Sequence, residues 1–239
     1  MILNPDLLSL VQDKSIALVG PAGYLTDENQ GAKIDGHDIV IRPNSFSIPA
    51  KLHSDYGSRT DIMFHNFGTP WMAGLRDQIS KSPKDFAALK MLACPVIKAS
   101  HQELDYMSWA EDKVSDVVKN AESVNEYNIP FYWIGIKDYQ KLATLMDCQP
   151  YTGILTLAIL LEYPIKELYM TGFSFYQDVK GRGIYHDGAL SDLDSYTGNH
   201  GGDTEHRQMQ FVQTLYNKLD SSLFEVDNVM KSSIIQHKE

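Results

Sequence analysis

The stretch NHGGDTEHRQ, residues Asn199–Gln208, places a histidine directly before a predicted helix. His200 precedes a diglycine step, and Asp203 or Thr204 can cap the helix that follows. An imidazole with an unperturbed pKa near ~6.5 is the usual group for taking a proton from a hydroxyl at neutral pH. The spacing therefore points to a general base, although a surface histidine without a role is the commoner outcome in an arbitrary sequence.

A glycine-rich stretch that ends at this diglycine step, residues 178–202, is predicted to be a loop. It carries Tyr185 and His186, and long loops in compact domains more often act as lids or binding loops than as plain connections. Just before it, GFSFYQD puts Tyr176 past the end of a predicted strand, where a phenol could hydrogen-bond a leaving phosphate or simply pack. The nucleophile-elbow pattern G-x-S-x-G is broken by Phe175, which argues against an α/β-hydrolase.

Two glycines follow the first predicted strand in IALVGPAGYL. Gly20 and Gly23 allow a close backbone approach, and parallel α/β sheets bind ligands beyond the carboxyl ends of their strands. The spacing G-x-x-G matches neither the dinucleotide pattern G-x-G-x-x-G nor the phosphate loop G-x-x-x-x-G-K-[ST]. A phosphate cradle and a tight structural turn are equally favoured here.

The segment PYTGILTLAILLEY predicts a helix that is apolar on almost every side and hence buried. Thr152 and Gly153 lie at its start, where unpaired amides and the positive end of the helix dipole suit a carboxylate or a phosphate. The simpler, competing interpretation is that Thr152 merely caps the helix.

The length and composition of the chain limit the kind of protein that can hold these groups in place. The chain has 239 residues, 43% hydrophobic and 22% charged, which fits a single globular domain over residues 1–239. A formal net charge of -10 disfavours broad contacts with nucleic acid or anionic membranes. The only cysteines, Cys94 and Cys148, predict free buried thiols in a reducing compartment. The amino terminus lacks a secretory pattern and no apolar stretch is long enough to span a bilayer, so we expect a cytoplasmic protein without an integral membrane segment.

Short β-rich runs alternate with longer helical patterns, which is typical of an α/β fold with a mostly parallel sheet flanked by helices. The predicted strands cover 16–19, 38–42, 61–64, 96–98 and 168–171. The predicted helices cover 71–80, 102–120, 137–146, 152–162 and 204–219. The chemistry above requires that segments far apart in this chain meet around one crevice.

Four motifs, taken together, resemble those of the sialyltransferases. IDGHDIVIRPNSF followed by DYGSRTDIMFHN resembles the large motif of glycosyltransferase family 29, in which a strand ends in R-x-N and a D-x-G-[ST]-[RK]-T step follows. YTGILTLAILLEYPIKELYMTGFSFY resembles the small motif of that family, and is at least as close to the bacterial sialyltransferases of family 42. His200 to Glu205 matches the motif H-x-x-x-x-E, and Tyr185-His186 falls where family 29 has a short aromatic-histidine motif. The large-motif residues are Arg42, Asn44, Asp55, Gly57, Ser58, Arg59 and Thr60.

The resemblance implies a single Rossmann-like domain of the variant GT-A type. It also implies an inverting transfer of a sugar acid, sialic acid by default, from a CMP-activated donor to a glycan or glycolipid hydroxyl, with no metal and no cofactor. His200 would be the general base, and the groups at the leaving phosphate would be Tyr176, Tyr185 and His186. The residues implied to meet the donor, beside Gly20 and Gly23 of the glycine loop, are Asn44, Asn66, Thr152, Gly153 and Gly172. Phenol, imidazole and amide donors can stabilise the charge on departing CMP without a cation.

The chain departs from the family pattern at three positions. Pro21 stands where both families usually have an asparagine after the first glycine, which leaves only backbone donors there. Ser15 and Ile165 occupy the positions of a disulfide that family 29 forms. This loss fits a chain kept from an oxidising compartment, as does the missing membrane anchor, and leaves at most a peripheral association with a membrane that carries the acceptor.

Three other functions compete with a sialyltransferase. The same pocket would serve CMP-Kdo or another nonulosonate. His186, Asp187, His200 and Asp203 could instead hold a divalent metal in a phosphoesterase, although no H-x-x-x-H or C-x-x-C spacing supports this. A non-catalytic nucleotide-binding module is the third alternative, because a fold alone does not establish activity.

Overall fold

The computed structural model describes residues 3–95, 111–175 and 204–236. These residues form a seven-stranded sheet with the strand order β5-β4-β3-β2-β1-β6-β7. All neighbouring strands of this sheet run parallel. The strands are β1 (Ser15–Val19), β2 (Ile39–Pro43), β3 (Ile62–Phe64), β4 (Met91–Cys94), β5 (Phe131–Trp133), β6 (Glu167–Thr171) and β7 (Phe224–Val226).

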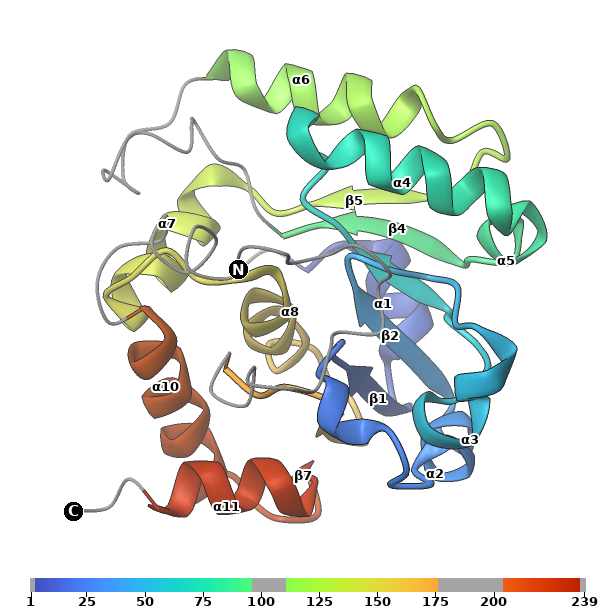
Figure 1. Ribbon diagram of the computed structural model, residues 1–239. Coiled ribbons are helices and arrows are strands. Elements are labelled where there is room, and N and C mark those ends of the chain that lie inside the picture. The colour runs from blue at the N-terminus through green and yellow to red at the C-terminus, as the bar shows by residue number, and fades with distance from the viewer. Residues whose placement is uncertain (1–2, 96–110, 176–203, 237–239) are drawn as a thin grey trace.

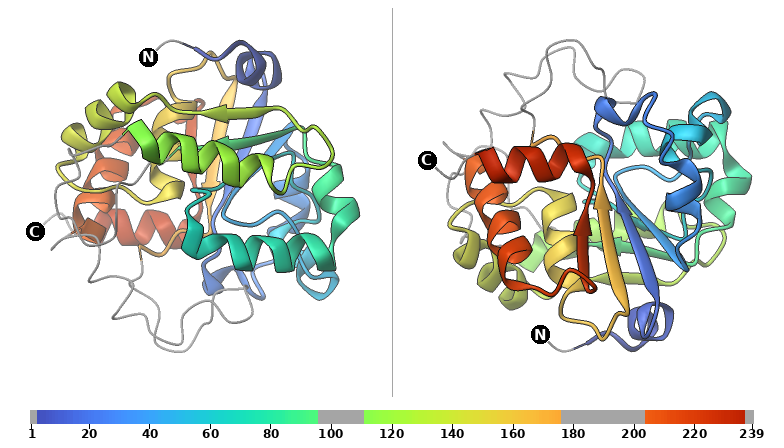
Figure 2. Two further views of the ribbon diagram at one scale, coloured as in Figure 1. Left: turned by 90° about the horizontal axis from the view of Figure 1, so that it is seen from above. Right: turned by 90° about the horizontal axis from the view of Figure 1, so that it is seen from below.

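Helices cover both faces of this sheet (Figures 1 and 2). Their bounds are α1 (Pro5–Val11), α2 (Gly31–Asp35), α3 (His53–Tyr56), α4 (Thr69–Lys81), α5 (Pro83–Ala87), α6 (Glu111–Glu122), α7 (Ile136–Met146), α8 (Thr152–Leu160), α10 (Thr204–Lys218) and α11 (Asn228–Gln236). Single 3-10 turns form η1 (Gly23–Leu25) and η2 (Ala50–Leu52). Helix α8 lies against β2 and β3, α2 lies against β1, and α10 packs on both α7 and α11.

The central strands are buried along their whole length, because helices cover them from both sides. Every residue of β1, β2 and β3 is buried, so these strands read as apolar runs rather than as alternating patterns. Successive side chains of β3 point to opposite faces. Met63 joins the core that α4 and α6 complete, whereas Ile62 and Phe64 join the core that contains α7 and α8.

Most of the predicted elements are present. The strands expected at 16–19, 38–42, 61–64 and 168–171 are confirmed as β1, β2, β3 and β6, each within one residue at either end. The helices expected at 71–80, 137–146, 152–162 and 204–219 are confirmed as α4, α7, α8 and α10. The later part of the helix expected at 102–120 is confirmed as α6. The strand expected at 96–98 lies outside the described residues, and β4, β5 and β7 were not predicted.

The order in which strands are added to the sheet reverses at β1. Strands β2 to β5 are added one after another on one side of β1, whereas β6 and β7 lie on its other side. The register of β1 with β6 runs from Ser15 opposite Glu167 to Val19 opposite Thr171. In open parallel sheets, ligands bind in the crevice beyond the carboxyl ends of the strands at such a switch point. The topology therefore locates a candidate site where Gly20 and Gly172 follow β1 and β6.

Candidate active site

Two glycines bring the ends of β1 and β6 into backbone contact. A Cβ added to Gly20 would lie 2.2 Å from the carbonyl oxygen of Gly172, and a Cβ added to Gly172 would lie 2.4 Å from the carbonyl oxygen of Gly20. Gly172 also has a φ of +79°, which side chains rarely tolerate. The Gly20 amide donates to the Thr171 carbonyl at 2.8 Å, and the Ala22 amide donates to the Gly172 carbonyl at 2.9 Å. A close backbone approach at Gly20 was predicted, and the group that approaches is Gly172.

The start of α8 lies at the same edge of the sheet. Phe173, the residue after Gly172, packs its ring on Gly153, where an added Cβ would lie 2.3 Å from a ring carbon. The same ring lies 3.0 Å from a Cβ added to Gly20. One aromatic side chain thus joins the helix start to the glycine contact. Phe173 was not among the predicted site residues, and its position directly after the glycine that follows β6 was the available signal.

Thr152 does not cap α8, so that interpretation is wrong. The N-cap residue is Tyr151, which makes no side-chain capping hydrogen bond, and Thr152 is the first helical residue. The Tyr151 carbonyl accepts the amides of Ile154 and Leu155 at 3.1 and 3.0 Å. The amides of Thr152 and Gly153 precede these and have no partner within the helix. A buried helix start of this kind offers donors and a positive dipole end to an anion.

Tyr151 also fastens the start of α8 to α10. Its amide donates to Oε1 of Gln208 at 2.8 Å, and its hydroxyl donates to Oε1 of Glu205. Between Glu205 and Gln208 in sequence, Arg207 forms an ion pair with Asp147, the C-cap residue of α7. Glu205, the last residue of the motif H-x-x-x-x-E, therefore serves a contact between two helices. This contact connects residues more than 50 positions apart in the chain, so no local pattern predicts it.

Asn44 and Asn66 follow β2 and β3 at this edge and differ in what their side chains do. Asn44 has a φ of +61°, and its amide donates to the Phe64 carbonyl at 2.7 Å. Its Oδ1 is buried, and no described residue donates a hydrogen bond to that atom. The Oδ1 of Asn66 instead accepts the amide of Gly68 at 3.0 Å. Buried polar atoms are normally paired, so the unused acceptor of Asn44 is suited to a ligand.

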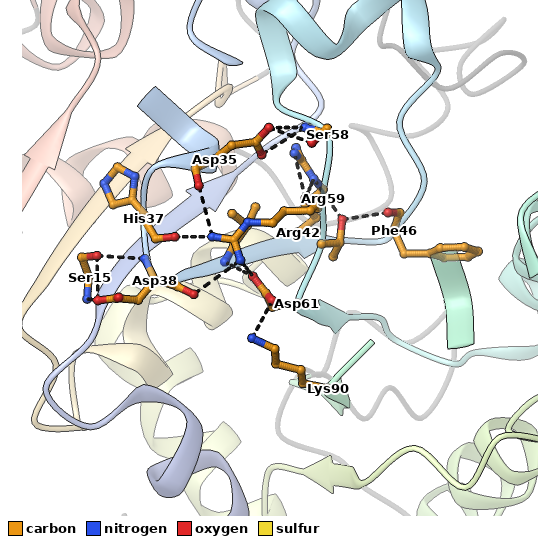
Figure 3. Close-up of polar contacts among 12 residues, drawn as sticks. Ser15, Asp35, His37, Asp38, Arg42, Phe46, Ser58, Arg59, Asp61 and Lys90 are labelled. Atoms are coloured by element: carbon orange, nitrogen blue, oxygen red, sulfur yellow. Dashed lines mark hydrogen bonds and ion pairs between the residues drawn. The ribbon is translucent and has the colours of Figure 1, made fainter. Parts of the chain in front are cut away.

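The arginines of the large motif support the fold behind the site (Figure 3). Arg42 is fully buried in β2, where its Nε donates to Oγ1 of Thr60 at 3.1 Å and its Nη2 donates to the Tyr56 carbonyl at 2.5 Å. Arg59 forms an ion pair with Asp61 at 2.7 Å. Together these contacts fix the segment before β3 against β2. Both arginines match the family motif in sequence, and their structural role was not predicted.

The remaining motif residues close the turn between α3 and β3. The amide and the hydroxyl of Ser58 both donate to Oδ2 of Asp35 at 2.8 Å (Figure 3). Gly57 has a φ of +76°, and a Cβ added there would lie 2.7 Å from Oδ1 of Asp35. Asp55 accepts the amide of Asn29 at 3.0 Å. Glycine is needed at this turn because both its backbone angle and its space exclude a side chain.

Ser15, one of the two positions at which family 29 is expected to form a disulfide, makes a polar contact with Asp38 instead. The amide and the hydroxyl of Ser15 donate to Oδ2 of Asp38 at 2.9 and 3.0 Å, and the Asp38 amide donates back to Oγ of Ser15 at 2.9 Å. These bonds, led by that from the Ser15 amide, lower the pKa of Asp38.

Cys94 and Cys148 are buried and free, as predicted. Burial, followed by the charge of Glu205, raises the pKa of the Cys148 thiol to about 12.

Several predicted residues lie outside the described part of the chain: Tyr176, Tyr185, His186, Asp187, His200 and Asp203. Gly23 is described and begins η1 in a buried position. Among the described residues, no group of three or more His, Cys, Asp or Glu side chains could hold a metal ion. Within the same residues, no helix is both long and apolar enough to cross a membrane.

A parallel sheet with a glycine contact and a buried helix start at its switch point defines an α/β protein that receives its ligand at that edge. The family model of glycosyltransferase family 29 (sialyltransferase) matches residues 8–163, which is more than half of the chain. The chain therefore belongs to glycosyltransferase family 29, as its motifs predicted, and is a glycosyltransferase. A comparison with curated protein sequences finds no match.

Solved sialyltransferase structures share the fold. A mammalian sialyltransferase aligns with a TM-score of 0.54 and 19% identity, over 94% of this chain and 73% of that chain. A mammalian sialyltransferase in complex with Gal-beta-1-3GalNAc-ortho-nitrophenol gives a TM-score of 0.52 at 18% identity, over the same shares of the two chains. An alpha-2,3-sialyltransferase from Campylobacter jejuni in apo form gives 0.52 at 14% identity, over 92% of this chain and 78% of that chain. At these identities the similarity concerns the fold alone.

Proposed function

We propose that this protein is an inverting sialyltransferase that transfers sialic acid from a CMP-activated donor to a glycan hydroxyl, without a metal ion or cofactor. The observation that carries the proposal is the buried start of α8, which lies beside the Gly20–Gly172 contact at the switch point of the sheet. Membership of family 29 supports the reaction class. The disaccharide derivative bound to a mammalian sialyltransferase of the same fold supports a glycan acceptor.

The groups at this edge suit such a donor. CMP-sialic acid carries a phosphate and a carboxylate, and the first amides of α8 with the helix dipole attract anions in a chain whose formal net charge is -10. The unused Oδ1 of Asn44 can accept a hydrogen bond from a ribose hydroxyl or from the cytosine amino group. Asn66 lies at the end of the neighbouring strand, where its Nδ2 remains a possible donor to the nucleotide. Gly153 and Gly172 lack side chains, which lets the Phe173 ring and the Gly20 backbone close in on them and so brings the start of α8 to the glycine contact.

The proposed chemistry needs one base and several donors. His200 takes the proton of the acceptor hydroxyl, whose oxygen attacks the anomeric carbon from the face opposite CMP, so that the configuration inverts. The bond from that carbon to the phosphate oxygen breaks, and Tyr176, Tyr185 and His186 donate hydrogen bonds to the phosphate as its charge grows. His200 precedes Glu205 by five residues, a length that spans at most about 18 Å when fully extended. The hydrogen bond from Tyr151 to Glu205 ties that short segment to the start of α8 and so supports a base near the donor.

Turnover of defined donors tests the proposal. CMP-sialic acid and CMP-Kdo are incubated separately with the protein and a panel of glycan acceptors, and CMP release is measured. We expect release from CMP-sialic acid, and we expect His200→Ala to lower turnover by at least ~10²-fold with nearly unchanged CMP affinity, because general-base catalysis contributes at least this factor. His206→Ala, an exposed histidine of α10, is the matched control and should keep the parent rate.

The other outcomes separate the alternatives. Release from CMP-Kdo alone would assign the site to another sugar acid. CMP binding without turnover across all acceptors would support a binding module instead of an enzyme. Equal rates for His200→Ala and the parent protein would remove His200 from the mechanism.

A further inference from the structure

A buried hydrogen-bond network lies behind the Gly172–Phe173 segment and joins the two ends of the described chain. The hydroxyl of Tyr24, in η1, donates to Oδ2 of Asp227 at 2.5 Å, across 203 positions of sequence. The same hydroxyl accepts the amide of Gly172 at 2.8 Å and the amide of Phe173 at 3.2 Å. The glycine loop after β1 thereby holds the backbone after β6 through one side chain.

Asp227 holds the other side of this segment. It follows β7 directly and is only 7% exposed. Its Oδ2 accepts the Thr171 hydroxyl at 2.7 Å and the Gly172 amide at 3.3 Å, in addition to Tyr24. Its Oδ1 accepts the amide of Met230 at 2.8 Å in the first turn of α11. Both carboxylate oxygens are therefore used, one for the strand end and one for the helix.

The direction of these hydrogen bonds follows from the groups themselves. Backbone amides can only donate, so the Tyr24 oxygen accepts from Gly172 and Phe173 and has its own proton left for Asp227. Burial, followed by the charge and hydrogen bond of Asp227, raises the pKa of the Tyr24 phenol far above its ordinary value. The phenol keeps its proton at every physiological pH, so the network does not rearrange by titration of Tyr24.

The segment that this network holds forms a wall of the candidate site. The amides of Gly172 and Phe173 are occupied by Tyr24, and the Gly172 carbonyl accepts the Ala22 amide. Gly172 therefore shapes the edge through its position and its missing side chain rather than through its backbone donor. The Phe173 ring then sets the spacing between Gly20 and Gly153, and hence between the glycine loop and the start of α8.

We propose that Tyr24 and Asp227 are positioning residues of the donor site, which fix the Gly172–Phe173 backbone and so hold the start of α8 at the distance that the donor requires. This inference rests on the proposed function. Tyr24 lies within the residues that the family model matches and Asp227 lies outside them, and neither needs to touch the donor. Their effect on the reaction acts entirely through Gly172 and Phe173.

The chain offers a matched control at the opposite edge of the sheet. Tyr163 is also a buried phenol, 4% exposed, and its hydroxyl accepts the amide of Asn4 at 3.0 Å. It precedes β6, whereas Gly172 follows it. Tyr163→Phe and Tyr24→Phe each remove one hydroxyl from a buried side chain, so a purely structural role predicts a loss of stability in both variants and no selective effect on the donor.

The experiment compares Tyr24→Phe, Asp227→Asn and Tyr163→Phe by thermal unfolding, CMP calorimetry, steady-state kinetics with CMP-sialic acid, and hydrogen exchange at Gly172 and Phe173. We expect Tyr24→Phe and Asp227→Asn to speed exchange of these amides, to weaken CMP binding, and to lower kcat/KM for the donor about 10- to 100-fold, as expected for a small displacement of a binding wall. Tyr163→Phe should keep both donor values within about twofold. If Asp227→Asn does not fold, Thr171→Val removes one donor to the same carboxylate and should give a smaller change in the same direction.

Two different results would count against the two proposals. If the parent protein binds CMP and Tyr24→Phe behaves like Tyr163→Phe in CMP affinity and kcat/KM, the positioning role is overturned while the proposed function stands. If the parent protein neither binds CMP nor releases it from CMP-sialic acid, the proposed function fails and the donor role of Tyr24 and Asp227 fails with it, whatever the exchange data show.

Discussion

At the scale of single residues, Asn44 is the clearest candidate for a contact with the nucleotide. It combines a left-handed backbone with a buried Oδ1 that no described residue satisfies. A buried acceptor without a donor lowers stability, by about 1–3 kcal/mol in typical cases. A ligand that donates to this atom would recover that free energy on binding, which makes Asn44 a source of affinity rather than of fold stability.

The buried Oδ1 of Asn44 predicts the effect of Asn44→Gly on CMP affinity. Glycine adopts a positive φ without strain, so the change removes the side chain while it spares the backbone. We expect CMP affinity, measured by calorimetry, to fall by about tenfold, the equivalent of one hydrogen bond of about 1.4 kcal/mol. Asn128→Gly makes the same exchange at an exposed position with a φ of +54° and should leave CMP affinity unchanged. Equal affinities for the two variants would exclude Asn44 from the nucleotide site.

The contact between Ser15 and Asp38 predicts a dependence of stability on acid. The hydrogen bonds from Ser15 lower the pKa of Asp38 in the folded chain. A carboxyl with a depressed folded pKa stabilises the fold above its unfolded pKa, near ~3.9, and this contribution is lost as the pH falls through the lower folded value. Thermal unfolding midpoints should therefore drop less steeply below about pH 4 in Asp38→Asn than in the parent protein. Asp116→Asn, on an exposed face of α6, should keep the parent slope, and a parent slope in Asp38→Asn would contradict the assignment.

At the scale of elements, sequence patterns were informative where a strand or helix is decided locally. The strands β1, β2, β3 and β6 are mostly apolar, and so is α8, so their burial on both sides is visible in composition. Strands β5 and β7 have three residues each, too few to give a period. They form because neighbouring strands offer unpaired backbone groups. Strands of this kind can be recognised only when the arrangement of their neighbours in the fold is known.

The candidate site likewise contains some residues that the sequence indicates and others that only the fold reveals. Gly20 could be recognised because a glycine after a strand signals a close approach, Gly153 because it marks a helix start, and Gly172 through the family resemblance. Tyr24 and Tyr151 could not, because their partners lie far away in the chain. Residue type reveals where a side chain is excluded, whereas a hydrogen bond between distant elements becomes visible only when the fold is known.

The link between α8 and α10 gives a prediction at this scale. Tyr151→Phe removes the hydroxyl that donates to Glu205 but keeps the amide that donates to Gln208. We expect kcat with CMP-sialic acid to fall by about tenfold while CMP affinity stays close to that of the parent, because the start of α8 remains intact and the segment before α10 loses a constraint. Hydrogen exchange in the first turn of α10 should rise. Tyr127→Phe changes an exposed tyrosine, 48% accessible, and should alter neither property.

At the scale of the whole molecule, the charge balance raises the question of how the anionic donor of the proposed reaction would be bound. The formal net charge is -10, so attraction must come from local groups. The start of α8 supplies fixed dipoles at the switch point, and such preorganised donors can stabilise a departing phosphate without a cation.

Metal independence follows as a prediction of the proposed mechanism. Exhaustive treatment with a chelator should leave the rate of CMP release within about twofold of the untreated rate, and added Mg²⁺ or Mn²⁺ should not increase it, because no step uses a cation. Loss of activity on chelation and its return with Mn²⁺ would favour a metal-dependent enzyme instead.

The position of β1 in the sheet also affects how the chain folds during its synthesis. Strand β1 pairs on one side with β2, which follows it closely, and on the other side with β6, about 150 residues later. At synthesis rates of about 5–20 residues per second, roughly 8 to 30 seconds pass between the two. During that interval the apolar residues Ile16 and Leu18 lie in a strand with an open edge, which is a template for pairing with another nascent chain. Chaperone supply during translation, rather than the stability of the finished sheet, should therefore limit the yield of this protein in an expression host.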